Sequence, residues 1–293
     1  MTIPGRVRAG QILLYVGRPL ALLFAWDIVV TVVYLCSHAK VNFPALPMSL
    51  MATVVAIYLS FRNTAAYARW WEARTLWGSL VNASRTFARE VVMLAASESI
   101  SLQRELVLRH VAYVHSLRLH LRRESPWEEL SLRLPQEEIV NLRRVANVPN
   151  AILRRTAEIV ARQCNADSVR LVAIERTMAD ISNAQGGMER IKNTPFPKQY
   201  STYPIFFTHV FCILLPLGLV ESLGWYTVLG STAAGFLFLA LLKIGSDMQE
   251  PFANTENDVP ITTLARAIEI DLLDGLDERH SIKPIPIENN VVW

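Results

Sequence analysis

FPALPMSLMATVVAIYLSF at residues 43–61 runs directly into RNTAAYARWWEARTLWGSLVNASRTFARE at residues 62–90. The first part carries no charge and is long enough to cross the hydrocarbon core of a bilayer, about 30 Å thick. Its prolines lie near the start, where a helix tolerates them. The second part is polar and has no helix breaker except Gly78. This stretch therefore predicts one helix of about 40 residues, ~60 Å long, that begins in lipid and ends in water.

Three further apolar segments have the length of a membrane span. They lie at about residues 16–36, 203–221 and 225–243. Asp27 is the only charged residue between Pro19 and Cys36, and a tight turn at residues 221–224 separates the last two segments. With residues 43–61, these segments predict four transmembrane helices, the last two forming an antiparallel hairpin.

Charge is concentrated between the apolar segments. The chain is 52% hydrophobic and only 19% charged, whereas soluble domains carry about 25% charged residues. The loop between the first and second spans contains one basic residue, Lys40, and the loop between the third and fourth spans contains none. The middle of the chain, by contrast, is rich in Arg. The positive-inside rule therefore places both termini, residues 62–200 and residues 247–293 in the cytoplasm. We treat residues 1–293 as a single domain.

Several kinds of chemistry have no support in the sequence. Arg alternates with Glu and Leu at helical spacing, which favours solvated helix faces over a nucleic-acid-binding patch. No Gly-rich phosphate loop or G-x-S-x-G motif occurs. His110, His115 and His120 are five residues apart, which spreads them around a helix, so we expect no metal site and no cofactor. The three cysteines (Cys36, Cys164 and Cys212) are expected to be reduced packing residues.

Two polar residues lie at membrane depth. Asp27 belongs to the first span and His209 to the third. Ionisable residues in spans are candidates for function, but both can equally serve as hydrogen-bonding groups between neighbouring helices.

Four strings of the sequence resemble the signature of the bestrophin family. They are Phe61-Arg62-Asn63 with YARWWEARTLWG at residues 67–78, ERIKNTPFP at 189–197, residues 247–260, and AIEIDLL at 267–273. The resemblance extends from about Ile12 to Pro286. The residues we assign to the family motif are Arg62, Asn63, Arg69, Trp70, Trp71, Glu72 and Arg74. From spacing alone, their charged members would anchor the membrane boundary and form ion pairs within the helix.

The resemblance implies an all-helical homopentamer around a central pore, with the second span lining a narrow neck. Thr53, Ile57 and Phe61 fall at the three neck positions. Their spacing of four residues puts them on one helix face; by itself that face predicts no more than packing. A second, cytoplasmic aperture is expected at Val169, with Leu171 as the alternative.

The family's calcium-binding acidic run is incomplete here. Pro251-Phe252 is followed by Asn254, Thr255 and Asn257 where acids would be expected, so we expect no calcium site. Asp258 can instead cap the helix expected after Pro260.

These features predict a passive channel for small monovalent ions in a bacterial inner membrane, and not an enzyme. The family resemblance implies anions such as chloride, although cation conduction is possible for bacterial members. The expected partners are further copies of the chain, the lipid bilayer and small inorganic ions. A membrane-bound enzyme with its active site in the Arg-rich middle, or a non-conducting scaffold, are the alternatives.

Overall fold

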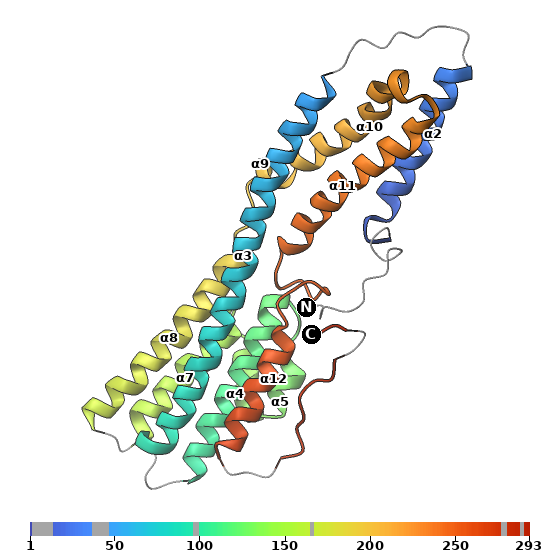
Figure 1. Cartoon of the computed structure of the whole chain (residues 1–293). Coiled ribbons are helices and arrows are strands. Elements are labelled where there is room, and N and C mark those ends of the chain that lie inside the picture. Colours follow the sequence, from blue (N-terminus) through green and yellow to red (C-terminus); the bar gives the residue numbers. More distant parts are fainter. Residues whose placement is uncertain (2–13, 37–46, 96–99, 165–166, 277–279, 288–289) are drawn as a thin grey trace. The chain divides into compact units, whose positions relative to one another are not determined.

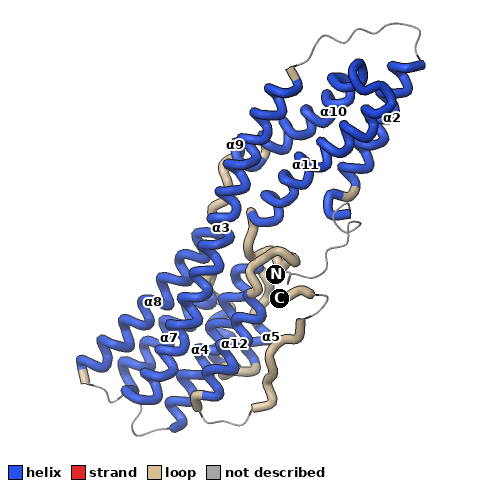
Figure 2. The backbone as a smooth tube through the Cα atoms, viewed as in Figure 1, coloured by secondary structure: helices blue, strands red, loops and turns tan. Residues whose placement is uncertain are grey.

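The computed structural model describes residues 1, 14–36, 47–95, 100–164, 167–276, 280–287 and 290–293. Apart from turns and extended segments, the described chain is helical, with no strand (Figures 1 and 2). The elements are α2 (Arg18–Cys36), α3 (Met48–Glu90), the π-helix η1 (Val91–Ala95), α4 (Ile100–Arg122), α5 (Trp127–Ser131), α6 (Gln136–Leu142), α7 (Val148–Gln163), α8 (Ser168–Asn193), α9 (Lys198–Ser201), α10 (Tyr203–Leu223), the 3-10 helix η2 (Gly224–Tyr226), α11 (Thr227–Met248) and α12 (Ile261–Asp274).

The long helix expected from the sequence is present. α3 runs for 43 residues without a break, which corresponds to about 65 Å. Residues 43–46 of the expected span lie outside the described residues. By length and hydropathy, α2 and the stretch Lys198–Met248, which contains the α10–α11 hairpin, are candidate membrane spans.

The chain divides into two compact units. We call Pro4–Trp70 with Pro195–Glu250 the apolar unit, and Met1–Ile3, Trp71–Thr194 and Pro251–Trp293 the charged unit. The boundary between them falls within α3, between Trp70 and Trp71.

In the apolar unit, α2, α10 and α11 pack side by side (Figure 1). Their shared core includes Leu23, Phe211, Leu215 and Leu239, and Val55 and Leu59 of α3 join it. Small residues allow close approach: a Cβ on Gly235 would collide with Leu23. Such small-residue contacts are typical of helices that associate in membranes.

In the charged unit, α4 is the central helix. It contacts α5, α7, α8, α12 and η1 (Figure 2). Every residue of α4 from Arg109 to Leu119 is buried, so this part of the helix is covered on all sides. α12 begins directly after Pro260, as expected, but Asp258 does not cap it. Instead the Asp258 carboxylate accepts hydrogen bonds from the backbone N–H and the hydroxyl of Thr255.

Candidate pore-lining surface

One face of α3 is left uncovered by the rest of the described chain. Thr53 is exposed, and Ile57 and Phe61 are 52% and 63% exposed. Val55 and Leu59 lie roughly on the other side of the helix, because two residues turn it by about 200°, and both are buried. The three expected neck residues therefore share one open face, while the opposite face is packed into the apolar unit.

Arg62 anchors the packed side. It is 1% exposed, and its guanidinium donates hydrogen bonds to the carbonyl oxygens of Tyr200 and Leu242, each at 3.0 Å. It also donates to Ser246 Oγ at 3.0 Å and Gln249 Oε1 at 3.3 Å. Neighbouring Asn63 donates to the Leu241 carbonyl oxygen at 2.9 Å. These two motif residues tie α3 to the C-terminal end of α11 and so fix which face of α3 stays open.

The open face is apolar in its first turns. An apolar hollow of about 360 Å³ lies along it, lined by Val54, Val55, Ile57, Tyr58 and Phe61 of α3 and by Phe207 of α10. The hydroxyl of Thr53 donates to the Ser49 carbonyl oxygen at 2.8 Å. Its single proton is therefore used within the helix, which leaves only its oxygen lone pairs and methyl group for other contacts.

Farther along α3 the open face becomes polar. Thr64, Thr75, Ser79 and Asn82 are all exposed. Ser79 lies 18 residues after Phe61, which is about five full turns, so both side chains point to nearly the same side. The same stripe of α3 is thus uncovered in both its apolar and its polar halves.

The remaining motif residues make specific contacts. The Arg69 guanidinium lies 5.5 Å from the centre of the Phe196 ring, and Trp70 stacks on Tyr67 with ring centres 6.4 Å apart. Trp71 is 55% exposed, and Arg74 is half-buried. Glu72 pairs with Arg190 of α8 at 2.5 Å. This partner lies 118 residues away in the sequence, so Glu72 links α3 to α8.

The expected aperture residues lie in the first turn of α8. Asp167 caps this helix, its Oδ1 accepting a hydrogen bond from the backbone N–H of Arg170 at 2.9 Å. Val169 is 80% exposed, whereas Leu171 is half-buried. Val169 is therefore the more accessible of the two apolar side chains in the described chain.

The two polar candidates in the spans form hydrogen bonds inside the apolar unit. Asp27 is fully buried and accepts hydrogen bonds from the hydroxyls of Ser231 and Thr232 of α11, at 2.8 and 2.7 Å. His209 Nδ1 lies 2.7 Å from the Ile205 carbonyl oxygen on its own helix. Asp27 thus joins α2 to α11, and His209 satisfies part of its hydrogen bonding within α10.

The three histidines of α4 turn to separate partners. His110 Nε2 lies 2.8 Å from Ser84 Oγ, and burial lowers the pKa of His110 to about 3, so its ring is neutral. His120 approaches Glu189 at 3.7 Å. Among the described residues, no His, Cys, Asp and Glu side chains form a group that could hold a metal ion.

All three cysteines are free; Cys164 and Cys212 are buried, but Cys36 is exposed.

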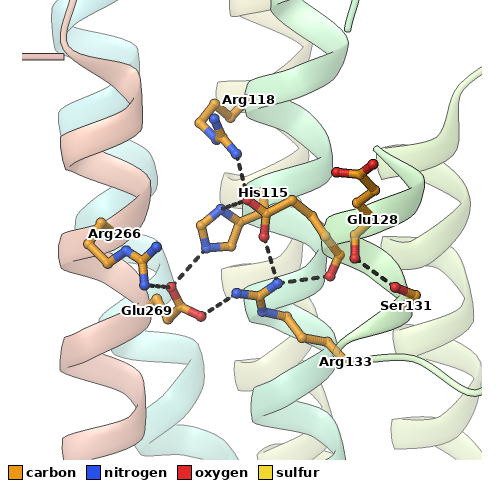
Figure 3. A network of polar contacts seen from close by, with 8 residues as sticks. His115, Arg118, Glu128, Ser131, Arg133, Arg266 and Glu269 are labelled. Atoms are coloured by element: carbon orange, nitrogen blue, oxygen red, sulfur yellow. Dashed lines mark hydrogen bonds and ion pairs between the residues drawn. The ribbon is translucent and has the colours of Figure 1, made fainter. Parts of the chain in front are cut away.

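His115 belongs to a charged network that sequence reasoning missed (Figure 3). Its Nε2 lies 3.1 Å from Glu269 of α12, and Arg133 pairs with the same carboxylate at 2.5 Å. Arg133 also pairs with Glu129 at 2.8 Å. Burial alone would raise the pKa of Glu269, but the hydrogen bonds from His115 and Arg133 outweigh burial and lower this pKa to about 2. The network joins α4, α5 and α12 and holds Glu269 ionised.

A family model described as Bacterial/Fungal Bestrophin protein matches residues 5–274. The chain belongs to the bestrophin family. Among curated relatives, the voltage-dependent anion channel-forming protein of Ralstonia nicotianae is 36% identical over 242 residues, which cover 81% of this bestrophin and 79% of the relative. The voltage-dependent anion channel-forming protein YneE of Escherichia coli is 34% identical over 274 residues, 92% of this chain and 89% of YneE.

Solved structures show the same fold. A crystal structure of a bacterial bestrophin homologue from Klebsiella pneumoniae is 27% identical, with a TM-score of 0.84 over 89% of this bestrophin and 98% of that chain. The all-helical membrane-protein fold expected from the sequence is therefore confirmed.

Proposed function

We propose that copies of this bestrophin assemble as a homopentamer around one axis and form a passive ion channel in the bacterial inner membrane. The relatives named as anion channel-forming proteins support the channel function. They also favour anions such as chloride as the permeant ions over the alternative, small monovalent cations.

The observation that carries this proposal is the uncovered face of α3. An apolar face on a membrane helix can simply contact lipid, but lipid contact gives no reason for the face to stay open where it becomes polar. Exposed residues on this face include 50, 54, 57, 61, 64, 68, 71, 75, 79 and 82, which follow one another at intervals of three or four residues. That spacing is typical of helices that pack around a common axis. A water-filled conduit explains why this face of α3 stays uncovered both where it is apolar and where it is polar.

Thr53, Ile57 and Phe61 would form the neck of this conduit. Hydrocarbon side chains offer no replacement for an ion's hydration shell, so a ring of them gates by excluding water. Thr53, whose hydroxyl proton is occupied by Ser49, would contribute the least apolar of the three rings. No cofactor and no covalent chemistry are needed for passive flux.

We further propose four membrane crossings, with both termini and the charged unit in the cytoplasm. Val169 would form the cytoplasmic aperture, since its side chain is 80% exposed; Leu171 is the alternative. In this arrangement the motif residues Arg62 and Asn63 hold α3 against α11, and they do not contact ions.

The test is ion flux through liposomes that contain the purified protein, followed by native mass spectrometry of the assembly. We expect fast, passive chloride flux and a pentamer. A scaffold or an enzyme would give no flux, and a monomer in both detergent and bilayers would rule out an axial pore. The sign of the reversal potential in a KCl gradient then separates anion from cation conduction.

A further inference from the structure

One ion pair lies on the open side of α3 just beyond the apolar neck residues. Glu72 of α3 and Arg190 of α8 approach within 2.5 Å, and their side chains are 46% and 68% exposed. An exposed pair of this kind contributes little to stability. Both groups remain accessible to water and therefore to ions.

The position of Glu72 follows from helix geometry. It lies 11 residues after Phe61, so it is about 16 Å farther along α3 and only about 20° around it. Glu72 therefore belongs to the same open stripe as the neck residues. By contrast Arg85, which pairs with Asp271 of α12 at 2.7 Å, is 13 residues beyond Glu72 and about 140° away from it.

We propose that the Glu72–Arg190 pair balances charge at the cytoplasmic exit of the neck, so that this ring adds little preference for either sign of ion. The inference rests on the proposed channel function. Each copy of the chain would add one carboxylate and one guanidinium to a ring around the axis. Because the two charges largely cancel, the intact ring favours neither sign strongly. Removing one partner leaves a ring of like charge, which concentrates ions of the opposite sign.

The experiment measures reversal potentials in planar bilayers under a KCl gradient. Glu72→Gln leaves Arg190 unbalanced, so the chloride-to-potassium permeability ratio should rise roughly threefold. Arg190→Gln leaves Glu72 unbalanced, and the ratio should fall by a similar factor. Both shifts should shrink at high ionic strength, because salt screens exposed charges beyond a few ångströms.

Two further variants keep the inference falsifiable. Exchanging the charges with Glu72→Arg and Arg190→Glu retains the pair, so the permeability ratio should return close to that of the unmodified protein even where a single variant assembles poorly. Arg85→Gln and Asp271→Asn change charge by the same amount on the other side of α3 and should leave the ratio unchanged.

The outcomes separate this inference from the proposed function. Absence of any current through the unmodified protein contradicts the channel itself. Normal currents whose reversal potential is the same with and without Glu72 or Arg190 contradict the charge-balancing role alone. Equal shifts in the Arg85 and Asp271 controls would also contradict it. Such shifts would show that the permeability ratio responds to the net charge of the protein and not to this particular pair.

Discussion

Arg62 Nη1 donates a hydrogen bond to the carbonyl oxygen of Leu242 at 3.0 Å and so joins α3 to α11. The same buried guanidinium serves three more acceptors, on residues 200, 246 and 249. Lys at this position would place one compact ammonium where a planar fork is needed.

Replacing this arginine with methionine should destabilise the protein. Arg62→Met keeps an apolar stem but leaves several buried acceptors without a donor, which costs about 2 kcal/mol or more. We expect a clearly lower midpoint of thermal unfolding in detergent, measured by intrinsic tryptophan fluorescence. Arg89→Met, at an exposed position near the end of α3, is the matched control. Equal midpoints for the two variants would contradict the anchoring role of Arg62.

Gly245 of α11 leaves room for the side chains of Arg62 and Asn63. A Cβ there would lie 2.7 Å from Arg62 Nη1 and would also collide with the Asn63 side-chain oxygen. Gly245→Ala should therefore lower the unfolding midpoint despite the better helix propensity of alanine. Gly186→Ala, whose Cβ meets nothing within 4 Å, should be neutral or slightly stabilising in the same assay. A neutral Gly245→Ala variant would mean that α3 and α11 are not tightly packed here.

The neck proposal predicts altered conduction. Ile57→Ala and Phe61→Ala each remove apolar bulk from the open face, so water and ions should pass with a lower barrier. We expect a higher unitary conductance or a higher open probability in planar bilayers. Phe206→Ala removes an equally exposed aromatic side chain from α10 (61% exposed) and should change neither quantity. Unaltered currents in both neck variants would show that this face does not line the pore.

Glu269 should make stability depend on pH. Its pKa falls from an ordinary value of 4.5 to about 2 in the folded protein, so the folded state favours the ionised form. The resulting stabilisation, roughly 3 kcal/mol, is complete above pH 4.5 and is lost as the pH falls towards 2. Thermal unfolding measured from pH 6 to pH 3 should show this decline.

Two variants test whether Glu269 causes the acid-dependent loss of stability. Glu269→Gln should be less stable at neutral pH and should lose less stability on acidification than the unmodified protein. Glu128→Gln, at an exposed position of α5, should leave the pH profile unchanged. A Glu269→Gln profile that runs parallel to that of the unmodified protein would contradict the linkage.

Local patterns in the sequence predicted the helices well. The uninterrupted stretch from Met48 to Glu90 forms one helix, because the absence of breakers is a local property. α2 begins at Arg18, because Gly17, with a positive φ of 60°, separates it from the helical residues 14–16. The π-helix at Val91–Ala95 has no comparable signal in the sequence.

Long-range pairing was not predictable in the same way. Arg62 meets acceptors between 138 and 187 residues away, and Glu269 meets His115 across 154 residues. Periodicity shows that such residues share a helix face, but not which helix covers that face. For this reason the pairing of Glu72 with Arg190 of α8 could not be predicted from the spacing within α3. The neck and aperture assignments remain predictions that the proposed experiments test.

The shortness of the apolar part of the α3 face bears on how the assembly would respond to a membrane potential. Eight residues separate Thr53 from Phe61, or about 12 Å, less than half of a hydrocarbon layer about 30 Å thick. The electric field is steepest where water is excluded, so most of the work on a crossing charge, about 2.3 kcal/mol per 100 mV for the whole membrane, would be done over these two turns. The arginines and glutamates of the charged unit would then experience almost no field, and a voltage-driven response would have to originate in the two turns themselves.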